Sequence, residues 1–226
     1  MVNDWFKWGV GELVGTFTLI FIGAGSICLD AFTGGGVGLV GIAFAHGLAI
    51  AVMVSALMHT SGGHLNPAVT ISLVATGKMK IAPGVIYVIA QLLGAVLAAL
   101  CLREIFPPET WQSVSLGATV LADGVTAGQG ILMEGILTFF LLFVIWGTGV
   151  DSRGAGQIAG LAIGLTITLD ILAGGGITGG SMNPARTFGP ALVAGVWSNH
   201  FVYWIGPVLG GLAASFVYRF VLLKEE

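Results

Sequence analysis

Charged residues are scarce in this sequence, since Asp, Glu, Lys and Arg together make up only 8% of its 226 residues. Soluble domains carry about 25%. Hydrophobic residues make up 56%, and the mean hydropathy is +0.98. The formal net charge is −3, so the basic surplus of a nucleic-acid-binding protein is missing as well. This composition indicates an integral membrane protein and gives no reason to expect a nucleic acid partner.

Cysteine is also rare: Cys28 and Cys101 both lie in apolar stretches, so we expect buried free thiols rather than a disulfide or a metal pair. The start, MVNDWFKWGVGELVG, lacks the basic residues and cleavage site of a signal peptide, so we expect the first apolar segment to be retained. No Ser/His/Asp set, phosphate-binding loop or metal-ligand spacing is visible. We therefore expect no enzyme activity, no cofactor and no metal.

Long apolar runs are what the sequence does have. Six of them have the length of about 20 residues that a membrane crossing needs, at about 9–29, 37–58, 83–105, 129–149, 156–176 and 200–222. Two shorter runs lie at about 67–77 and 184–193. At ~1.5 Å per residue these reach only about half of a ~30 Å hydrocarbon core. We expect them to enter the membrane without crossing it.

Similar features recur in the two halves of the chain. Asn66 and Asn183 lie 117 positions apart, and Glu12 and Glu134 lie 122 apart. Because each half holds three spans, an odd number, the second half must cross the membrane in the opposite direction. We predict one domain over residues 1–226, with inverted repeats at about 9–106 and 128–223 and a linker at about 107–127. The two half-spans then meet near the middle of the membrane.

Basic residues predict the orientation, because Lys and Arg accumulate in cytoplasmic loops. With the N-terminus inside, only Arg103 faces out, and the cytoplasmic set is Lys7, Lys78, Lys80, Arg153, Arg219 and Lys224. Arg186 belongs to neither set, since it lies in the second half-span. A charge at that depth is costly unless it faces water or a partner. Arg186 is therefore predicted either to line a pore or to belong to a structural ion pair.

Two polar phrases, HTSGGHLNPAVT at 59–70 and ITGGSMNPARTF at 177–188, introduce the half-spans. Asn is a favoured helix N-cap and Pro a favoured first helical residue, so Asn66-Pro67 and Asn183-Pro184 each predict a helix start. The Gly-Gly pair before each one permits a tight turn. Non-helical backbone at membrane depth is tolerated only where it is buried in protein or lines a water-filled cavity. The phrases therefore predict a cavity at mid-membrane.

The facing half-spans also predict which solutes would pass. Two opposed helix N-termini place about half a positive charge each at the centre, which opposes cations and protons but not neutral molecules. If each Asn oxygen caps its own helix, its amide donor stays free to face the cavity. Two such donors on one water would interrupt a proton-conducting chain. The plainer alternative is a pair of ordinary helix caps in a buried loop.

HLNPAVT at 64–70 and MNPARTFGPA at 182–191 resemble the two signature boxes of the major intrinsic protein family, the aquaporins and glycerol facilitators. The resemblance covers essentially the whole chain. It implies an all-α membrane protein, a right-handed bundle of six tilted helices with two half-helices, assembled as a homotetramer with one pore per subunit. It also implies that the two pore boxes are Asn66, Pro67, Ala68 and Asn183, Pro184, Ala185.

The resemblance further implies a selectivity filter made of His46, Ile171, Gly180 and Arg186. Water-selective members usually place an aromatic residue at the first of these positions and His at the second, and this chain has neither there. We expect a wider constriction with one apolar wall. The set looks like that of the plant tonoplast intrinsic proteins, which pass water and, in several cases, ammonia, urea or glycerol.

Residues flanking the boxes favour the water-channel branch. Thr187 and Ala191 stand where dedicated glycerol facilitators usually carry Asp and a basic residue, and Tyr203-Trp204 resembles the aromatic pair of water channels. The function implied is a passive channel for water and small neutral solutes in the cell membrane, excluding protons and ions. Two alternatives stay open: a glycerol facilitator, and an ion-coupled secondary transporter, which also uses inverted repeats and broken helices.

Other polar residues carry narrower expectations. Glu12 and Glu134 are expected to accept hydrogen bonds from backbone N–H groups of the loops. His64 either contributes to the inner vestibule or anchors its loop. His46, if it is not simply a core residue, could gain a proton in a mildly acidic medium, which would oppose ammonium more than ammonia. Asp170 departs from the family pattern, and it is expected to pair with Arg186, to meet loop N–H groups or to lie in headgroup water.

Overall fold

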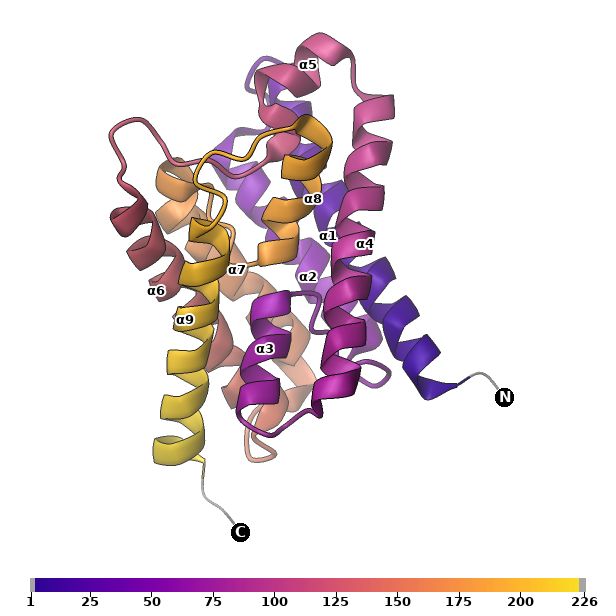
Figure 1. Ribbon diagram of the computed structural model, residues 1–226, viewed down its shortest axis with the longest axis vertical. Coiled ribbons are helices and arrows are strands. Elements are labelled where there is room, and N and C mark those ends of the chain that lie inside the picture. The colour runs from indigo at the N-terminus through magenta and orange to yellow at the C-terminus, as the bar shows by residue number, and fades with distance from the viewer. Residues whose placement is uncertain (1–2, 224–226) are drawn as a thin grey trace.

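The structure is a computed structural model that describes residues 3–223, and it is helical throughout (Figure 1). Within that range, six helices are long and apolar enough to cross a membrane. The elements are α1 (Asp4–Phe32), α2 (Gly38–Leu57), α3 (Pro67–Ala75), α4 (Ile81–Ile105), α5 (Pro108–Ser113), η1 (Ser115–Gly117), α6 (Ala127–Ile145), η2 (Trp146–Val150), η3 (Gly156–Ile158), α7 (Ala159–Thr178), α8 (Pro184–Ala194), α9 (Val202–Val217) and η4 (Tyr218–Leu222).

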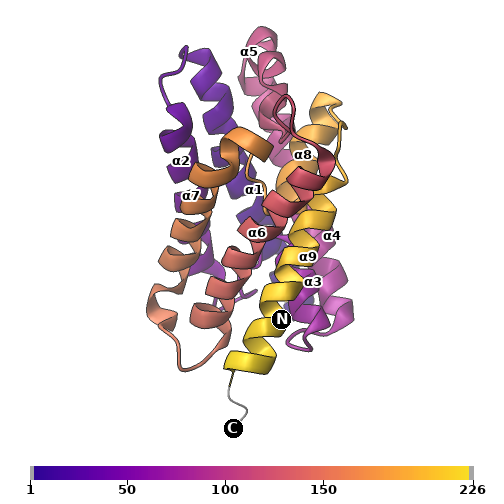
Figure 2. The same cartoon turned by 90° about the vertical axis from the view of Figure 1, so that its left-hand side faces the viewer.

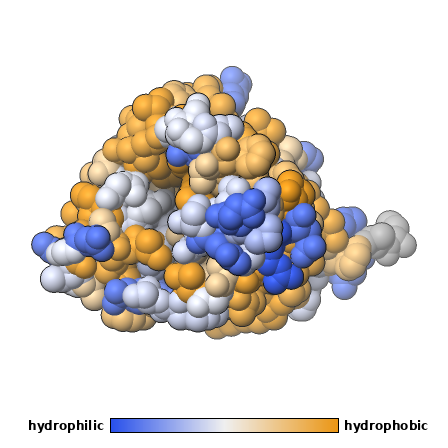
Figure 3. Space-filling model, turned by 90° about the horizontal axis from the view of Figure 1, so that it is seen from above, coloured by the Kyte–Doolittle hydropathy of each residue, from blue (hydrophilic) through white to orange (hydrophobic). Residues whose placement is uncertain are grey.

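The six spanning segments run over Asp4–Phe32, Gly38–Leu57, Ile81–Ile105, Ala127–Val150, Gly156–Thr178 and Val202–Leu222. Each overlaps one of the apolar runs, so the predicted all-α bundle is confirmed. The helices stand side by side and are tilted to one another (Figure 2). Seen from above, hydrophobic groups form most of the rim, and pale and blue groups gather towards the middle of this face (Figure 3). That distribution suits a molecule whose sides contact lipid.

The two half-length helices, α3 and α8, lie one above the other inside the bundle (Figure 1). They have 9 and 11 residues, so at ~1.5 Å per residue neither spans the membrane. Each begins at its Asn-Pro pair, with the Asn as N-cap and the Pro in the first turn. Because the asparagines lie at the facing ends, the two helix N-termini meet in the interior.

Close helix packing brings α2 and α7 together at small residues. A Cβ on Gly164 would lie 2.7 Å from Cβ of Ala51 and 2.8 Å from its backbone nitrogen, so only glycine permits this contact. Small residues at helix contacts are the usual means of association in a membrane. Since α2 carries His46 and α7 carries Ile171, this contact sets how far apart those side chains stand.

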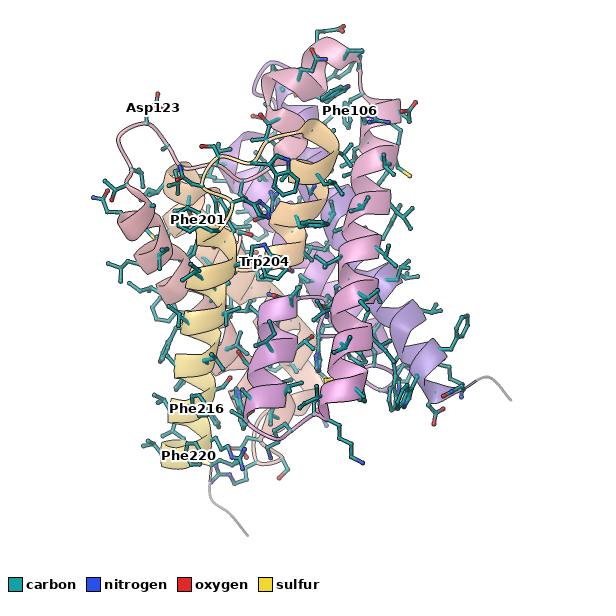
Figure 4. All side chains as sticks on the ribbon, viewed as in Figure 1. Phe106, Asp123, Phe201, Trp204, Phe216 and Phe220 are labelled. Atoms are coloured by element: carbon teal, nitrogen blue, oxygen red, sulfur yellow. The ribbon has the colours of Figure 1, made fainter. Side chains whose placement is uncertain are left out.

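The segment 107–127 contains more structure than a linker requires. It forms α5 and η1, and Leu116 is fully buried. Gly117 has a φ of +72°, and a Cβ there would lie 2.9 Å from Cβ of Ala24 on α1. The segment therefore folds down against the bundle, while its later part rises to a tip at Asp123 (Figure 4).

The basic residues of the predicted cytoplasmic set lie towards the end of the molecule where α3 ends and where η4 closes the described chain (Figure 1). Lys224, which belongs to that set, lies outside the described residues. The expectation for the cysteines is half right. Cys28 is a buried free thiol, but Cys101 is exposed on α4, because an apolar residue on a spanning helix can face lipid as well as the core.

Candidate channel site

The two asparagines each cap their own half-helix. Asn66 is extended, and its Oδ1 accepts from the backbone N–H of Ala68 at 2.8 Å. Asn183 is extended too, and its Oδ1 accepts from Ala185 at 3.0 Å and from Arg186 at 3.2 Å. These bonds satisfy N–H groups that the first turn of a helix leaves without partners.

The amide nitrogens of the same asparagines cross between the loops. Nδ2 of Asn66 donates to the carbonyl of Met182 at 2.8 Å, and Nδ2 of Asn183 donates to the carbonyl of Leu65 at 2.9 Å. The sequence predicts that these amide donors are free to face the cavity. The structure shows that each amide gives one of its two hydrogens to the opposite loop. One N–H on each asparagine remains for the cavity, which both residues line.

An unusual backbone conformation makes this crossing possible. Leu65 has a φ of 51° and Met182 a φ of 53°, values that residues other than glycine rarely adopt. Both residues directly precede the capping asparagines, so the strained positions occur at the same point of the two loops. The left-handed turn there directs each carbonyl at the other loop, and the two crossed hydrogen bonds offset its cost.

Glu12 on α1 holds the first loop from behind. Its carboxylate accepts from the backbone N–H groups of His64 at 3.0 Å and Leu65 at 2.6 Å. It also accepts from Ser61 Oγ at 2.7 Å and from Gln91 Nε2 at 2.8 Å. The side chain is fully buried. These bonds fix a loop that has no helical partners of its own.

Glu134 on α6 does the same for the second loop. It accepts from the backbone N–H groups of Ser181 at 2.9 Å and Met182 at 2.7 Å, and from Thr178 Oγ1 at 2.6 Å. A glutamine corresponding to Gln91 is missing, because position 207, 116 residues later, is Pro207. Glu134 therefore has three donors where Glu12 has four.

Tyr203 supports a loop and does not line the cavity described below. Its hydroxyl donates to the carbonyl of Thr178 at 2.8 Å, as the hydroxyl of Tyr87, 116 residues earlier, donates to the carbonyl of Ser61 at 2.7 Å. Trp204 donates from Nε1 to His200 at 3.2 Å and lies beside α8 near the upper end of α9 (Figure 4). The association of this pair with the pore is thus indirect.

Arg186 is buried, with 2% of its surface exposed, and is fixed by two hydrogen bonds. Its Nη1 donates to the carbonyl of Gly117 at 2.6 Å, and its Nη2 lies 3.0 Å from Nε2 of His46. Its Nε–H has no acceptor among the described residues. Two of the five guanidinium N–H groups are thus bonded to Gly117 and His46, and Arg186 belongs to the cavity lining.

His46 cannot act as the proton-binding group that the sequence suggested. Its Nδ1 lies 2.8 Å from the carbonyl of Ile42, an acceptor, so this nitrogen must carry the hydrogen. Nε2 then accepts from Arg186. Both ring nitrogens are occupied, and a second proton would face the guanidinium. This arrangement disfavours a second proton on the ring, and the fixed positive charge at this level is that of Arg186.

A continuous cavity of about 350 Å³ runs through these residues. Its lining includes both capping asparagines and the four residues of the predicted filter, His46, Ile171, Gly180 and Arg186, together with His64. His64 also places Nδ1 3.0 Å from Thr70 Oγ1, so it both lines the inner part and anchors its loop. Thr187 does not line the cavity; it bonds to Thr119 at 2.6 Å and to Ser181 at 2.7 Å.

Asp170 follows none of the three expectations. It is 3% exposed, so it does not lie in headgroup water. Its Oδ2 has no hydrogen-bond partner among the described residues, and no ion pair joins it to Arg186. It is a buried carboxyl group on α7, next to Ile171 but outside the cavity lining.

The cavity lining also includes Gly149 and Val150 of η2 and Lys78 from the turn after α3. Asp151 follows directly and accepts from Nε of Arg153 at 2.9 Å. The guanidinium lowers the pKa of this carboxyl group below its usual value. The hydroxyl of Tyr218 also donates to it, at 3.2 Å, which ties η2 to the last helix.

Two residues of the site were missed in the sequence. Gly117, in the linker, supplies a carbonyl to Arg186, and no motif marked it. Gly23 on α1 leaves room for the ring of His46, because a Cβ there would lie only 2.5 Å from its Nε2. Gly23 lies two residues before Gly25 in an apolar run, so its role could not be distinguished from helix packing.

Known proteins match this chain over most of its length. The sequence profile of the Major intrinsic protein family matches residues 2–218. Aquaporin TIP4-4 of Zea mays is 50% identical over 223 residues, covering 96% of this chain and 86% of that protein. Probable aquaporin TIP3-2 of Arabidopsis thaliana is 45% identical, covering 96% and 84%.

A solved structure agrees with the fold. The aquaglyceroporin from Plasmodium falciparum superposes with a TM-score of 0.85 at 27% identity, covering 96% of this chain and 97% of that one. Together with the paired half-helices and their crossed asparagines, these matches identify the chain as a channel protein rather than an enzyme. It belongs to the major intrinsic protein family, the family of passive channels for water and small neutral solutes.

Proposed function

We propose that the chain conducts water together with ammonia, urea and glycerol through this cavity and excludes protons and ions. The observation that carries the proposal is the wall of the filter: Ile171 and Gly180 line the same cavity as Arg186, whose guanidinium is fixed by Gly117 and His46. An apolar wall beside a fixed guanidinium suits a neutral solute that has both a carbon skeleton and a hydrogen-bonding group.

Acceptors for the solute are supplied by the loops. The carbonyl groups of Gly63, His64, Gly180 and Ser181 have no protein donor among the described residues, and all four residues line the cavity. Free carbonyls of this kind replace part of the hydration shell of a solute as it passes. They support a path in which water or a small hydroxyl compound exchanges one acceptor for the next.

Exclusion of charge follows from the centre of the cavity. The N-termini of α3 and α8 meet there, and each contributes about half a positive charge. The remaining amide N–H of Asn66 and of Asn183 adds a donor on each side. A water held by donors alone cannot pass a proton onward, and a cation meets a positive potential.

Stopped-flow light scattering on proteoliposomes tests the choice of solutes. Ile171→His replaces the apolar wall with an imidazole and narrows the filter. We expect glycerol and urea uptake to fall about tenfold, a barrier increase of about 1.4 kcal/mol, while osmotic water flux changes less. If the substitution leaves the ratio of glycerol to water flux unchanged, Ile171 is not part of the filter.

The same measurement ranks the two channel alternatives. A glycerol facilitator would take up glycerol fast at a low water flux, and an aquaporin with a relaxed filter would show high water flux with measurable glycerol uptake. Fast and nonsaturating flux without an ion gradient is the expected result for both. Saturation or dependence on a sodium or proton gradient would instead indicate a secondary transporter.

We also propose a homotetramer of inverted-repeat subunits located in the cell membrane. The assembly is supported by the family to which the chain belongs, because a homotetramer is typical of its members. Native mass spectrometry should give four times the 23.2 kDa of one chain. Because the relatives are named TIP proteins, an internal membrane is the competing location, and imaging of a tagged chain distinguishes the two.

A further inference from the structure

A second cavity, of about 400 Å³, lies on the outside of the bundle between α3 and α4. It is an apolar groove, and we call it the α3–α4 groove; its main lining residues are Ile71, Val74, Gly84, Val85, Val88 and Ile89. Its only hydroxyl group, that of Thr70, is already bonded inside the protein to Asn66 and Gln91. The groove therefore offers no polar partner to a ligand.

The corresponding region of the second half is filled. Phe188 lies 117 positions after Ile71. At an offset of 116 positions, Trp197 corresponds to Ile81, His200 to Gly84 and Trp204 to Val88. The rings of Trp197 and His200 lie 4.8 Å apart, and Phe188 lies 6.1 Å from Trp197. Trp204 donates to His200. Aromatic side chains thus fill the space between α8 and α9. In the equivalent space between α3 and α4, aliphatic residues and a glycine leave the groove open.

The depth of the groove corresponds to one membrane leaflet. It follows α4 from Ile81 to Ile89, about 12 Å at ~1.5 Å per residue. Half of a ~30 Å hydrocarbon core is about 15 Å. Ile81 is 72% exposed and Val85 53%, so the groove is open along its length. Its place beside α3 puts it on the cytoplasmic side (Figure 1).

Positive charge surrounds the cytoplasmic end of the groove. Lys80 directly precedes Ile81 and is exposed, whereas Lys78, in the same turn, lines the channel cavity. The guanidinium of Arg219 lies against this turn, since a Cβ on Gly77 would be 3.4 Å from its Nη1. Residues 67–102 contain no Asp or Glu. The turn at 77–80 and α4 down to residue 102 therefore place basic residues, and no acidic ones, beside an anionic headgroup at this level.

We propose that the α3–α4 groove binds one acyl chain of an anionic phospholipid from the cytoplasmic leaflet, with the headgroup phosphate held by Lys80. The groove supplies a dry apolar slot one leaflet deep, and the turn at 77–80 supplies the charge. Both features are confined to the half of the molecule that lacks the aromatic filling. The site is independent of the solute path, because its lining shares no residue with the channel cavity.

Native mass spectrometry of the detergent-solubilised protein tests this site with phosphatidylglycerol and phosphatidylcholine. The wild type should retain phosphatidylglycerol about tenfold more tightly, an affinity difference of about 1.4 kcal/mol. The double variant Ile71→Phe/Val88→Trp copies the filling of the other half and should lose retention of both lipids. Lys80→Gln should lose the preference for phosphatidylglycerol and keep the retention of phosphatidylcholine.

Leu93→Trp is the matched control, because Leu93 is 52% exposed on the same helix but lies outside the groove. It should bind both lipids as the wild type does. Water flux and melting temperature should be unchanged in Lys80→Gln, which shows that the channel is intact. Equal phosphatidylglycerol retention by the wild type and the filled variant would overturn the proposal. A filled variant with a changed oligomeric mass would also overturn it, since the groove would then contact another copy.

Discussion

The outer and inner halves of the channel cavity are lined by corresponding positions with opposite chemistry. At an offset of 117 positions the two halves correspond residue by residue: His46 to Ile163, Ile171 to Val54, Gly180 to Gly63, and Arg186 to Val69. All eight line the cavity. We call the first four the outer quartet and the last four the inner quartet. The outer quartet holds a histidine and an arginine in hydrogen bonds, and the inner quartet is apolar.

This difference shows how a filter can arise from one of two similar scaffolds. Both halves use a glutamate, a left-handed residue and a capping asparagine to build the loop. In the outer half the charge of Arg186 has a partner in the carbonyl of Gly117, which comes from the segment between the halves. The scaffold therefore positions the wall of the cavity, and two residues with one extra carbonyl give the outer quartet its polar chemistry.

The largest effect is expected from copying the charge into the inner quartet. Val69→Arg would place a guanidinium beside Ile163 instead of a histidine, with Lys78 in the same cavity lining. A charged side chain in a membrane helix costs roughly 3 kcal/mol. We expect a sharply lower yield and melting temperature in detergent. Val69→Met, of similar length without charge, should behave nearly as the wild type does; equal stability of Val69→Arg would contradict the comparison.

The two loop-holding glutamates should differ in their sensitivity to substitution. Each carboxylate oxygen of Glu12 accepts from two donors, so in Glu12→Gln the amide NH₂ faces two donors in either orientation. One oxygen of Glu134 accepts from Met182 alone, so in Glu134→Gln the NH₂ can face that single donor. A buried donor left unpaired costs about 1 kcal/mol or more. We therefore expect the free energy of unfolding to fall by about 2 kcal/mol in Glu12→Gln and by about 1 kcal/mol in Glu134→Gln. Thermal unfolding of both variants measures this. The reverse order would show that the hydrogen bonds are not what stabilises the loops.

Removing the charge from the outer quartet tests selectivity directly. Arg186→Val gives the outer quartet the residue of the inner one and leaves the carbonyl of Gly117 and Nε2 of His46 without their donor. We expect urea and glycerol flux to rise about tenfold, which is about 1.4 kcal/mol in barrier height. Arg186→Lys keeps the charge and should change the flux less. Unchanged solute ratios in Arg186→Val would show that another part of the cavity is limiting.

The smallest effect is expected from the inner counterpart of Ile171. Val54→His adds the same imidazole as Ile171→His, but no arginine stands opposite it, and the wall there is Ile163 and Val69. We expect the ratio of glycerol to water flux to change less than about twofold, or about 0.4 kcal/mol. A loss of glycerol uptake as large as that of Ile171→His would mean that both quartets select solutes.

Much of the fold could be predicted because it depends on local patterns. Apolar run length distinguished the spanning helices from α3 and α8, and each Asn-Pro pair marked a helix start. The contacts of Gly117 and Gly23 could not be predicted, since they depend on how distant segments fold together. The predicted roles of Tyr203 and Asp170 were wrong for the same reason. Sequence spacing gave their depth in the membrane but not the direction in which they point.

The two facing half-helices are proposed to exclude charge while letting neutral molecules through, and a comparison of water flux with proton current tests this exclusion. Water flux and proton current are measured on the same proteoliposomes, the first under an osmotic gradient and the second under a pH gradient with a fixed membrane potential. We predict fast water flux with a proton current no larger than that of empty liposomes. A proton current that rises with the amount of reconstituted protein would show that the half-helices do not exclude protons.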